Sequence, residues 1–197
     1  MQQTLEPTGA AADKRRLRAD IQARRLAIPE AVRLGAGSGV AAAVLALPEA
    51  ARIRSVGLYI SLPTEPPTGR LRAELRGRGV RVLLPVLREG GDLDWASDQG
   101  NAALVTGRGG VEHPDRPWLG KEAIAAADLV IVPALAVARD GVRLGRGGGS
   151  YDRALERVPG HVPVLALVWD GEVLDAGALP HEPHDRPVTG WVQVPAG

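Results

Sequence analysis

Asp128-Leu129-Val130-Ile131-Val132-Pro133 is the clearest pattern of a buried strand in the sequence. Its four consecutive branched apolar residues leave no polar face, which is typical of a parallel strand covered by helices on both sides. The stretch Pro163-Val164-Leu165-Ala166-Leu167-Val168 has the same character. Together these two segments predict strands at the centre of an open α/β sheet.

Outward from these strands, the sequence alternates between strand and helix patterns. Short β-type runs predict further strands at residues 55–60, 80–85, 92–96, 102–106 and 190–194, the last of them at an edge. Helical spacing of apolar residues predicts helices over 13–27, from Pro29 to Leu47, over 68–78 and after Ser150. We therefore expect an α/β fold with an open, mixed, mostly parallel sheet and helices on both faces, a three-layer Rossmann-like arrangement.

The length of 197 residues suits one domain. We expect residues 1–12 to be a disordered lead-in and residues 13–197 to form a single α/β domain. Asp13 is the expected N-cap of the first helix. Gly35, Gly37 and Gly39 weaken the first half of the second helix, because each costs about 1 kcal/mol relative to alanine.

The composition excludes several classes of protein. With no cysteine, the chain has no thiol nucleophile, disulfide, iron–sulfur cluster or zinc ribbon. Its 24 basic and 23 acidic residues give a net charge of +1, which argues against broad binding of nucleic acid. The longest apolar stretch, residues 39–48, is shorter than the roughly 20 residues that span a bilayer, and residues 1–12 lack the pattern of a secretory signal. We expect a soluble, cytoplasmic monomer without nucleic-acid or membrane partners.

The most unusual segment is Arg143-Leu144-Gly145-Arg146-Gly147-Gly148-Gly149-Ser150-Tyr151-Asp152-Arg153. Its glycines let the backbone approach an anion closely, and the predicted helix start behind them favours negative charge. The two arginines ahead of the last three glycines have forked donors suited to phosphate oxygens. Asp152 would repel an anion there unless a cation such as Mg²⁺ lay between them.

Other readings of this segment are possible from its residues alone. A flexible solvent loop has the same composition. A Walker A motif would need a lysine, a dinucleotide-binding motif would need glycine at Ser150, and a nucleophile elbow would need glycine at Asp152. The segment therefore indicates a phosphate cradle of another kind, without a serine nucleophile.

The same segment closely resembles the signature of the 5-formyltetrahydrofolate cyclo-ligase family. Further pieces follow the order of that family: Lys14-Arg15-Arg16-Leu17-Arg18, Tyr59-Ile60-Ser61 with Glu65, the strand at 128–133, and His184-Asp185. The resemblance spans about residues 13–194. It implies an enzyme that depends on ATP and Mg²⁺ and converts 5-formyltetrahydrofolate to 5,10-methenyltetrahydrofolate, with release of ADP and phosphate.

The resemblance also implies roles for individual residues. ATP would be bound by the motif Lys14 to Arg18 and by residues Arg143, Leu144, Gly145, Arg146, Gly147, Gly148, Gly149, Ser150 and Tyr151. The folate would be bound by Ile60, Glu65 and residues Arg146 to Ser150. Arg146 and Tyr151 would act in catalysis, and Asp152 and Asp185 would hold Mg²⁺. Many relatives carry tyrosine at the position of Ser150, and some carry lysine at that of Gly148.

Plainer readings of these residues stay open on the sequence alone. The motif Lys14 to Arg18 could be the solvated face of a helix, Glu65 a loop residue, and His184-Asp185 a surface turn. His181 and His184 suggest a metal site, but a third ligand is not evident. Two other functions also stay open: a family member that binds nucleotide or folate without turnover, and a sugar-phosphate or acyl-transfer enzyme that needs no ATP.

Overall fold

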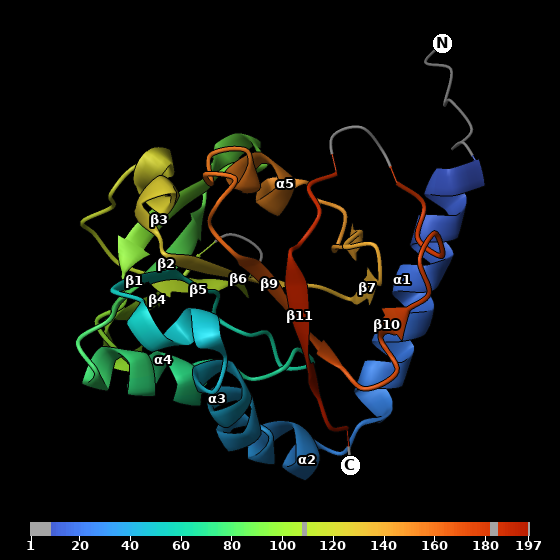
Figure 1. Ribbon diagram of the computed structural model, residues 1–197, viewed down its shortest axis with the longest axis horizontal. Helices are drawn as coiled ribbons and strands as arrows, with labels where there is room; N and C mark the ends of the chain where they lie inside the picture. Colours follow the sequence, from blue (N-terminus) through green and yellow to red (C-terminus); the bar gives the residue numbers. More distant parts are fainter. Residues whose placement is uncertain (1–8, 108–109, 182–184, 197) are drawn as a thin grey trace.

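The computed structural model describes residues 9–107, 110–181 and 185–196. Within these residues the main sheet has six strands, in the order β11-β9-β6-β1-β2-β3, and only β3 runs antiparallel to its neighbour. The strands are β1 (Ser55–Gly57), β2 (Arg81–Leu87), β3 (Leu93–Ser97), β6 (Leu129–Pro133), β9 (Val164–Trp169) and β11 (Gly190–Val194). This mixed, mostly parallel sheet with flanking helices confirms the predicted fold class (Figure 1).

Helices cover both faces of the sheet. The helices are α1 (Gly9–Ala27), α2 (Glu30–Gly35), α3 (Gly37–Leu45), α4 (Gly69–Gly77) and α5 (Ser150–Leu155), and the short 3-10 helices are η1 (Pro48–Arg52), η2 (Glu89–Gly91), η3 (Asn101–Ala103) and η5 (Lys121–Ala126). Figure 1 shows α3 and α4 below the sheet and α5 above it. The result is three layers, with the sheet in the middle.

The central strand β6 shows how the sequence specifies these layers. Leu129 and Ile131 pack into the apolar cluster that α3 and α4 share with the sheet. Val130 and Val132 point to the other face and pack with residues of η5 and α5. Side chains alternate across a strand, so a strand buried on both faces needs apolar residues at every position. The stretch at 128–133 meets that requirement.

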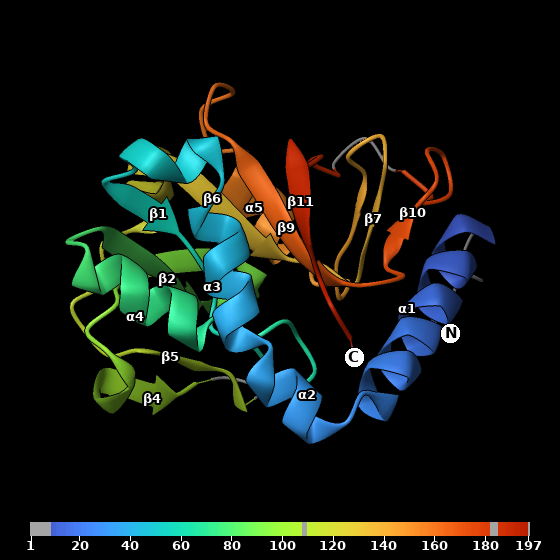
Figure 2. The same ribbon diagram turned by 60° about the horizontal axis from the view of Figure 1, so that its bottom comes forward.

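A second, smaller sheet lies beside the main one and was not predicted from the sequence. Its strands are β7 (Ala136–Ala138), β8 (Arg143–Leu144) and β10 (Val173–Leu174), and α1 covers it. Figures 1 and 2 both show α1 alongside β7 and β10. Leu17 and Ile21 of the helix pack in a separate apolar cluster with residues of this sheet. A two-stranded hairpin of β4 (Leu104–Thr106) and β5 (Glu112–Pro114) completes the strands of the described residues.

Several predicted boundaries were wrong. Helix α1 begins at Gly9 rather than at Asp13, so residues 9–12 belong to the helix and not to the expected lead-in, and residues 1–8 lie outside the described part of the chain. The helix expected from Pro29 is interrupted at Ala36, between the flanking glycines, and forms α2 and α3. Glycine lowers helix stability, which explains why the interruption falls there.

The first strand is also shorter than predicted, because β1 ends at Gly57 rather than at residue 60. Gly57 allows η5 to pack closely over the strand: a Cβ atom there would lie 2.3 Å from the Cδ1 atom of Ile124. Beyond it, Tyr59 and Ile60 leave the sheet and line a cavity. The predicted strands at 92–96 and 102–106 correspond to β3 and β4, and the predicted edge strand is β11.

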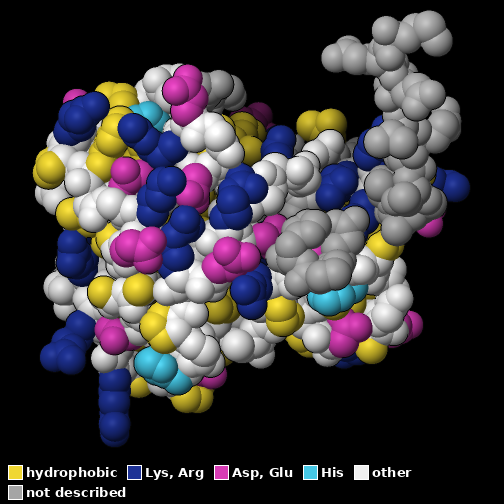
Figure 3. Space-filling view, turned by 90° about the horizontal axis from the view of Figure 1, so that it is seen from above, with side chains coloured by type: hydrophobic (Ala, Val, Ile, Leu, Met, Phe, Trp, Pro, Cys, Tyr) yellow, Lys and Arg dark blue, Asp and Glu magenta, His cyan; other side chains and the backbone are white. Residues whose placement is uncertain are grey.

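The face seen in Figure 3 carries basic and acidic side chains next to one another. Asp92 pairs with Lys121 at 2.8 Å and with Arg157 at 3.0 Å, and Arg157 also pairs with Glu122 at 3.0 Å. Because positive and negative side chains alternate on this face, it lacks the uniformly positive potential that attracts a polyanion such as nucleic acid.

In the described part of the chain, no single helix has the length and apolar character needed to cross a membrane. One sharply bent pair, Ala12–Ala27 with Glu30–Leu45, meets these requirements only when its two helices are taken together.

Candidate active site

A large cavity lies where the carboxyl ends of β1, β2 and β6 approach the glycine-rich segment and α1. Its volume is about 1070 Å³. Typical small-molecule sites have volumes of about 300–1,000 Å³, so this cavity has room for more than one substrate-sized molecule. Ligands of open α/β sheets bind at this end of the strands, because loops lead from there into the helices.

The glycine-rich segment forms one wall of the cavity. Gly147 has a φ of 100°, and a Cβ atom there would lie 3.3 Å from the guanidinium carbon of Arg18. Gly149 has a φ of 65° and directly precedes α5. Glycine adopts these left-handed conformations without steric cost, which explains its density in this wall. Helix α5 has only six residues, so its dipole contributes less than the sequence suggested.

Arg153 shapes this wall from behind and was not predicted as a site residue. Its Nη2 atom donates hydrogen bonds to the carbonyl oxygen of Gly148 at 3.1 Å and to that of Gly91 at 2.6 Å. The side chain therefore ties the glycine-rich segment to η2. Its position at the end of the signature was visible in the sequence, but its partners were not.

Only part of the N-terminal basic motif, Lys14 to Arg18, lies at the cavity, because the residues of a helix point in different directions. Lys14 and Arg18 lie one turn apart on α1 and line the cavity, and Arg18 Nε donates to the carbonyl oxygen of Gly145 at 2.9 Å. Arg15 and Arg16 are exposed, and Leu17 packs against the small sheet rather than lining the cavity. Residues at i and i+4 share one face of a helix, so only these two basic residues face the site.

The two predicted metal ligands line the cavity, and each forms an ion pair with a basic residue of the predicted ATP site. Asp152 Oδ1 lies 2.8 Å from Nη2 of Arg143, and Asp185 Oδ2 lies 2.8 Å from Nζ of Lys14. The backbone N–H of Arg186 donates to Asp152 Oδ1 at 3.3 Å, which brings the segment of Asp185 next to Asp152.

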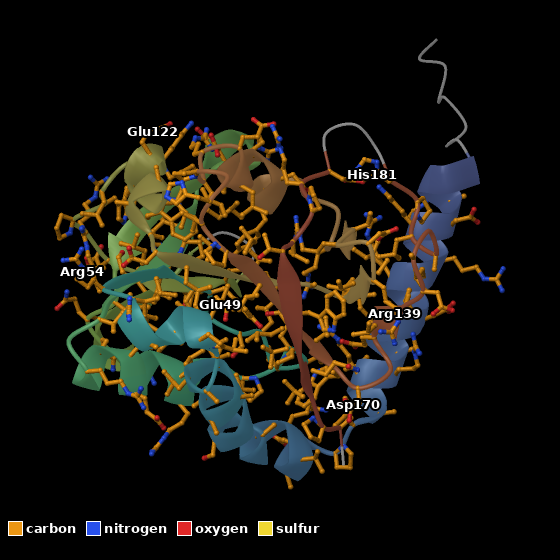
Figure 4. The ribbon with its side chains drawn as sticks, in the orientation of Figure 1. Glu49, Arg54, Glu122, Arg139, Asp170 and His181 are labelled. Atoms are coloured by element: carbon orange, nitrogen blue, oxygen red, sulfur yellow. The ribbon has the colours of Figure 1, made fainter. Side chains whose placement is uncertain are left out.

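A histidine metal site finds no support in the described residues, which contain no group of three or more acidic or histidine ligands suited to a metal ion. His181 lies near the upper half of α1 in Figure 4. His184 is outside the described residues, so its predicted place beside Asp185 is not described.

Glu65 lies on the opposite wall and is 6% exposed. Burial raises the pKa of its carboxyl group, although the N–H of Leu62 and the charge of Arg146 oppose that shift. The Leu62 N–H donates to Glu65 Oε2 at 2.9 Å, and Nη1 of Arg146 lies 3.9 Å from Oε1. Arg146 therefore lies between the glycine-rich wall and the buried carboxylate. Ile60 lines the cavity on the same side as Glu65.

Two tyrosines line the cavity near this carboxylate. Burial and the charge of Glu65 raise the pKa of Tyr151 well above its ordinary value, and the same two causes raise that of Tyr59. Both phenols therefore stay protonated at neutral pH and act as hydrogen-bond donors rather than as bases. The Tyr151 ring lies 6.0 Å from the guanidinium of Arg143.

The structure thus brings most of the predicted site residues to one cavity. The glycine-rich segment from Arg143 to Asp152, the pair Ile60 and Glu65, and Asp185 all line it. Tyr59 and Arg153 were not predicted as site residues but also line it. Tyr59 could have been identified from its place next to Ile60.

Comparison with known proteins gives a consistent result. Residues 10–193 match the model of the 5-formyltetrahydrofolate cyclo-ligase family. The chain is 39% identical to the 5-formyltetrahydrofolate cyclo-ligase of Mycolicibacterium smegmatis over 181 residues, covering 89% of this chain and 91% of the relative. It is 30% identical to the enzyme of the same name from Escherichia coli over 138 residues, covering 69% of this chain and 76% of the relative.

Solved structures show the same similarity. The structure of 5,10-methenyltetrahydrofolate synthetase from Aquifex aeolicus superposes with a TM-score of 0.75 at 27% identity, covering 93% of this chain and 89% of the other. The synthetase from Mycoplasma pneumoniae superposes with a TM-score of 0.68 at 18% identity, covering 91% of this chain and 98% of the other. The second of these similarities concerns the fold alone.

Proposed function

The chain belongs to the 5-formyltetrahydrofolate cyclo-ligase family, and we propose that its large cavity holds ATP against the glycine-rich wall and a reduced folate against Glu65. A relative that is 39% identical over most of the chain supports the activity itself: the protein is a 5-formyltetrahydrofolate cyclo-ligase. The observation that supports the assignment of the two walls is the position of Arg146, which belongs to the glycine-rich wall and lies 3.9 Å from the buried carboxylate of Glu65.

For the ATP half, the support comes from charge and backbone geometry. Lys14, Arg18, Arg143 and Arg146 line the cavity next to a run of glycines. Arginine side chains pair with phosphate oxygens through two parallel hydrogen bonds, and the glycines expose backbone N–H groups to the same anion. Arg15, Arg16 and Leu17 point elsewhere, so we assign them no contact with the nucleotide.

For the folate half, the support comes from a buried acceptor. Glu65 is a carboxylate that can accept paired hydrogen bonds from the amino edge of the pterin ring. Its burial excludes water, so these bonds would be formed in a low-dielectric environment, where they discriminate strongly between ligands. Ile60 offers an apolar surface beside it.

The reaction then follows from the placement of the two substrates. The formyl oxygen at N5 attacks the γ-phosphorus of ATP and ADP departs, which turns a poor leaving group into phosphate. N10 of the folate attacks the activated formyl carbon, the phosphate leaves with the formyl oxygen, and the N10 proton is lost as the methenyl bridge forms. Arg146 would neutralise charge on the transferred group, and the Tyr151 hydroxyl would donate a hydrogen bond to it. The protein contributes chiefly positioning and charge.

We also propose that Asp152 and Asp185 hold Mg²⁺ when ATP is bound. Both are carboxylates that line the cavity at the end of the glycine-rich wall, and oxygen ligands of this kind suit a hard cation. Bound Mg²⁺ would neutralise charge on the phosphates of ATP. Arg143 and Lys14, which now pair with these carboxylates, would be available to the phosphates.

A monomer in the cytoplasm remains our proposal for the state of the protein in the cell. The absence of cysteine supports the proposed compartment, because the cytosol keeps thiols reduced and disulfides are rare there. Size-exclusion chromatography with light scattering measures the first part directly, and a dimer would overturn it.

An absorbance assay tests the proposed function. The purified protein is mixed with 5-formyltetrahydrofolate, Mg²⁺ and ATP, and the absorbance of methenyltetrahydrofolate is followed. We expect product only when ATP is present, with one ADP formed for each methenyl group. Binding of folate without any change in absorbance would instead support a binding protein, and product without ATP would contradict phosphoryl transfer.

A further inference from the structure

Trp169 connects the end of β9 to the segment that carries Glu65. Its side chain is almost fully buried, with 1% exposed. The indole Nε1 donates a hydrogen bond to the carbonyl oxygen of Thr64 at 3.0 Å. Thr64 directly precedes Glu65, so a strand end 105 residues further along the chain fixes the backbone next to the folate-binding carboxylate.

The segment 61–67 makes other hydrogen bonds of a more local kind. The Leu62 N–H donates to Glu65 within the segment, and the hydroxyl of Thr68, directly after the segment, donates to the carbonyl oxygen of Tyr59, ahead of the segment, at 2.7 Å. These bonds close the segment on itself and define its shape. The bond from Trp169 has a different effect, because it fixes the middle of the segment to the main sheet.

Trp169 is in turn held by a buried ion pair. Its backbone N–H donates to Glu172 Oε2 at 2.7 Å, and the Arg25 guanidinium donates to both carboxylate oxygens of Glu172 at 2.7 Å. Arg25 also donates to the carbonyl oxygen of Ala134, which lines the cavity, at 2.6 Å. Figure 4 shows Asp170, the residue after β9, beside the lower half of α1, where these contacts lie.

We propose that Trp169, held by the Arg25–Glu172 pair, is a positioning residue for the folate: its indole N–H keeps the segment 61–67 in the conformation that presents Glu65 to the pterin ring. This inference rests on the proposed role of Glu65. Trp169 itself is not expected to touch the reacting atoms, and it lies outside the set of residues that line the cavity.

The expected effect follows from the cost of pre-organisation. When only a fraction of the molecules holds the binding conformation, the apparent dissociation constant of the ligand rises in inverse proportion to that fraction. A hydrogen bond of ordinary net strength stabilises a conformation by about three- to tenfold. Loss of the Trp169 N–H should therefore raise the folate KM by up to roughly tenfold, with little change in kcat or in the ATP KM.

The test is the variant Trp169→Phe, which keeps an aromatic ring and removes the donor. Trp95→Phe is its matched control: Trp95 is also 1% exposed, but its Nε1 has no hydrogen-bond partner among the described residues, and it is not among those that line the cavity. For each variant we would measure the folate KM, the ATP KM and kcat, the melting temperature, and the dissociation constant of 5-formyltetrahydrofolate without ATP. If Trp169→Phe does not fold, β-(3-benzothienyl)alanine at position 169 has nearly the shape of tryptophan without the N–H.

The expected result is weaker folate binding in the Trp169 variant, in both the KM and the equilibrium measurement, and unchanged folate binding in the Trp95 variant. Equal shifts in the two variants, or an equal rise in the ATP KM, would indicate general loosening of the core and overturn the inference. Glu65→Gln separates this failure from that of the proposed function. An effect of Glu65→Gln without one at Trp169 overturns the positioning role alone, whereas normal folate binding in Glu65→Gln overturns both.

Discussion

The two walls of the cavity are built in opposite ways. The wall that we propose for ATP is a run of glycines, of which Gly147 and Gly149 have left-handed conformations, and it carries Arg146, whose side chain is 53% exposed. The wall that we propose for folate centres on Glu65, which is 6% exposed and belongs to a segment fixed by hydrogen bonds from Leu62, Thr68 and Trp169. One wall offers positive charge, whereas the other offers a fixed acceptor.

This difference matches the chemistry of the two ligands. A triphosphate carries concentrated negative charge, which basic side chains and closely approaching backbone N–H groups neutralise. A pterin edge presents hydrogen-bond donors in a rigid pattern, which a pre-organised buried acceptor distinguishes best. Substitutions on the ATP wall should therefore change kcat most, and substitutions on the folate wall should change the folate KM.

The largest effect is expected at Arg146. In Arg146→Ala, loss of a charge aimed at the transferred phosphoryl group should lower kcat by roughly 10²–10³. Arg139→Ala is the control, because its side chain is 65% exposed and lies outside the cavity, with only a 3.9 Å contact to Asp175. Steady-state kinetics of both variants test the assignment. Unchanged kcat in a folded Arg146→Ala variant would contradict its catalytic role.

The ATP wall was the more predictable of the two because its parts are contiguous. The residues from Arg143 to Asp152 carry the backbone freedom, the charge and the carboxylate in one short stretch. The strand at 128–133 was predictable for a similar reason, since its burial on both faces requires an unbroken apolar run. The glycines around Ala36 indicated that the second predicted helix is weak at the place where the structure interrupts it.

The folate wall was less predictable because its stability depends on contacts between distant residues. Arg25 and Glu172 are 147 residues apart, and Trp169 and Thr64 are 105 apart, with no local pattern that links them. A buried arginine in a basic helix looks like its exposed neighbours until its partner is known. The small sheet was missed because strands as short as β8 and β10, of two residues each, have no measurable period.

A smaller effect is expected at Glu65 and concerns folate affinity. Replacing the carboxylate in Glu65→Gln leaves one pterin donor without its acceptor, which costs about 1–3 kcal/mol. The folate KM should rise by roughly 5- to 150-fold, while the ATP KM changes little. Glu49→Gln, on the exposed surface at η1, is the control. A larger rise in the ATP KM than in the folate KM would indicate that Glu65 binds the nucleotide and not the folate.

The pH dependence of folate binding sharpens this prediction. Only the ionised carboxylate accepts both hydrogen bonds, and burial raises the pKa of Glu65. Folate binding should therefore weaken as the pH falls, beginning above the ordinary glutamate pKa of about 4.3. Glu65→Gln should lose this dependence. A profile identical in the two proteins would exclude ionised Glu65 as the acceptor.

The smallest effect is expected at the two aspartates, because Mg²⁺ also takes ligands from phosphate oxygens and water. In Asp152→Asn the Mg²⁺ concentration for half-maximal activity should rise by roughly three- to tenfold, and in Asp185→Asn by less; both effects are limited because one carboxylate remains to bind the ion in each variant.

The ion pairs in the structure suggest a second role that the two aspartates could have instead of binding Mg²⁺. Each aspartate neutralises a basic residue of the proposed ATP wall. If the aspartates serve only that purpose, their loss would remove one counter-ion from Arg143 or Lys14, and more of the positive charge would act on the phosphates. The ATP KM would then fall while the Mg²⁺ titration overlays that of the parent. Titrating Mg²⁺ at fixed ATP, and ATP at saturating Mg²⁺, in both folded variants distinguishes a metal ligand from a counter-ion. A rise in the Mg²⁺ requirement without a fall in the ATP KM would place the cation between the carboxylates and the nucleotide, on the wall that depends on charge rather than on fixed geometry.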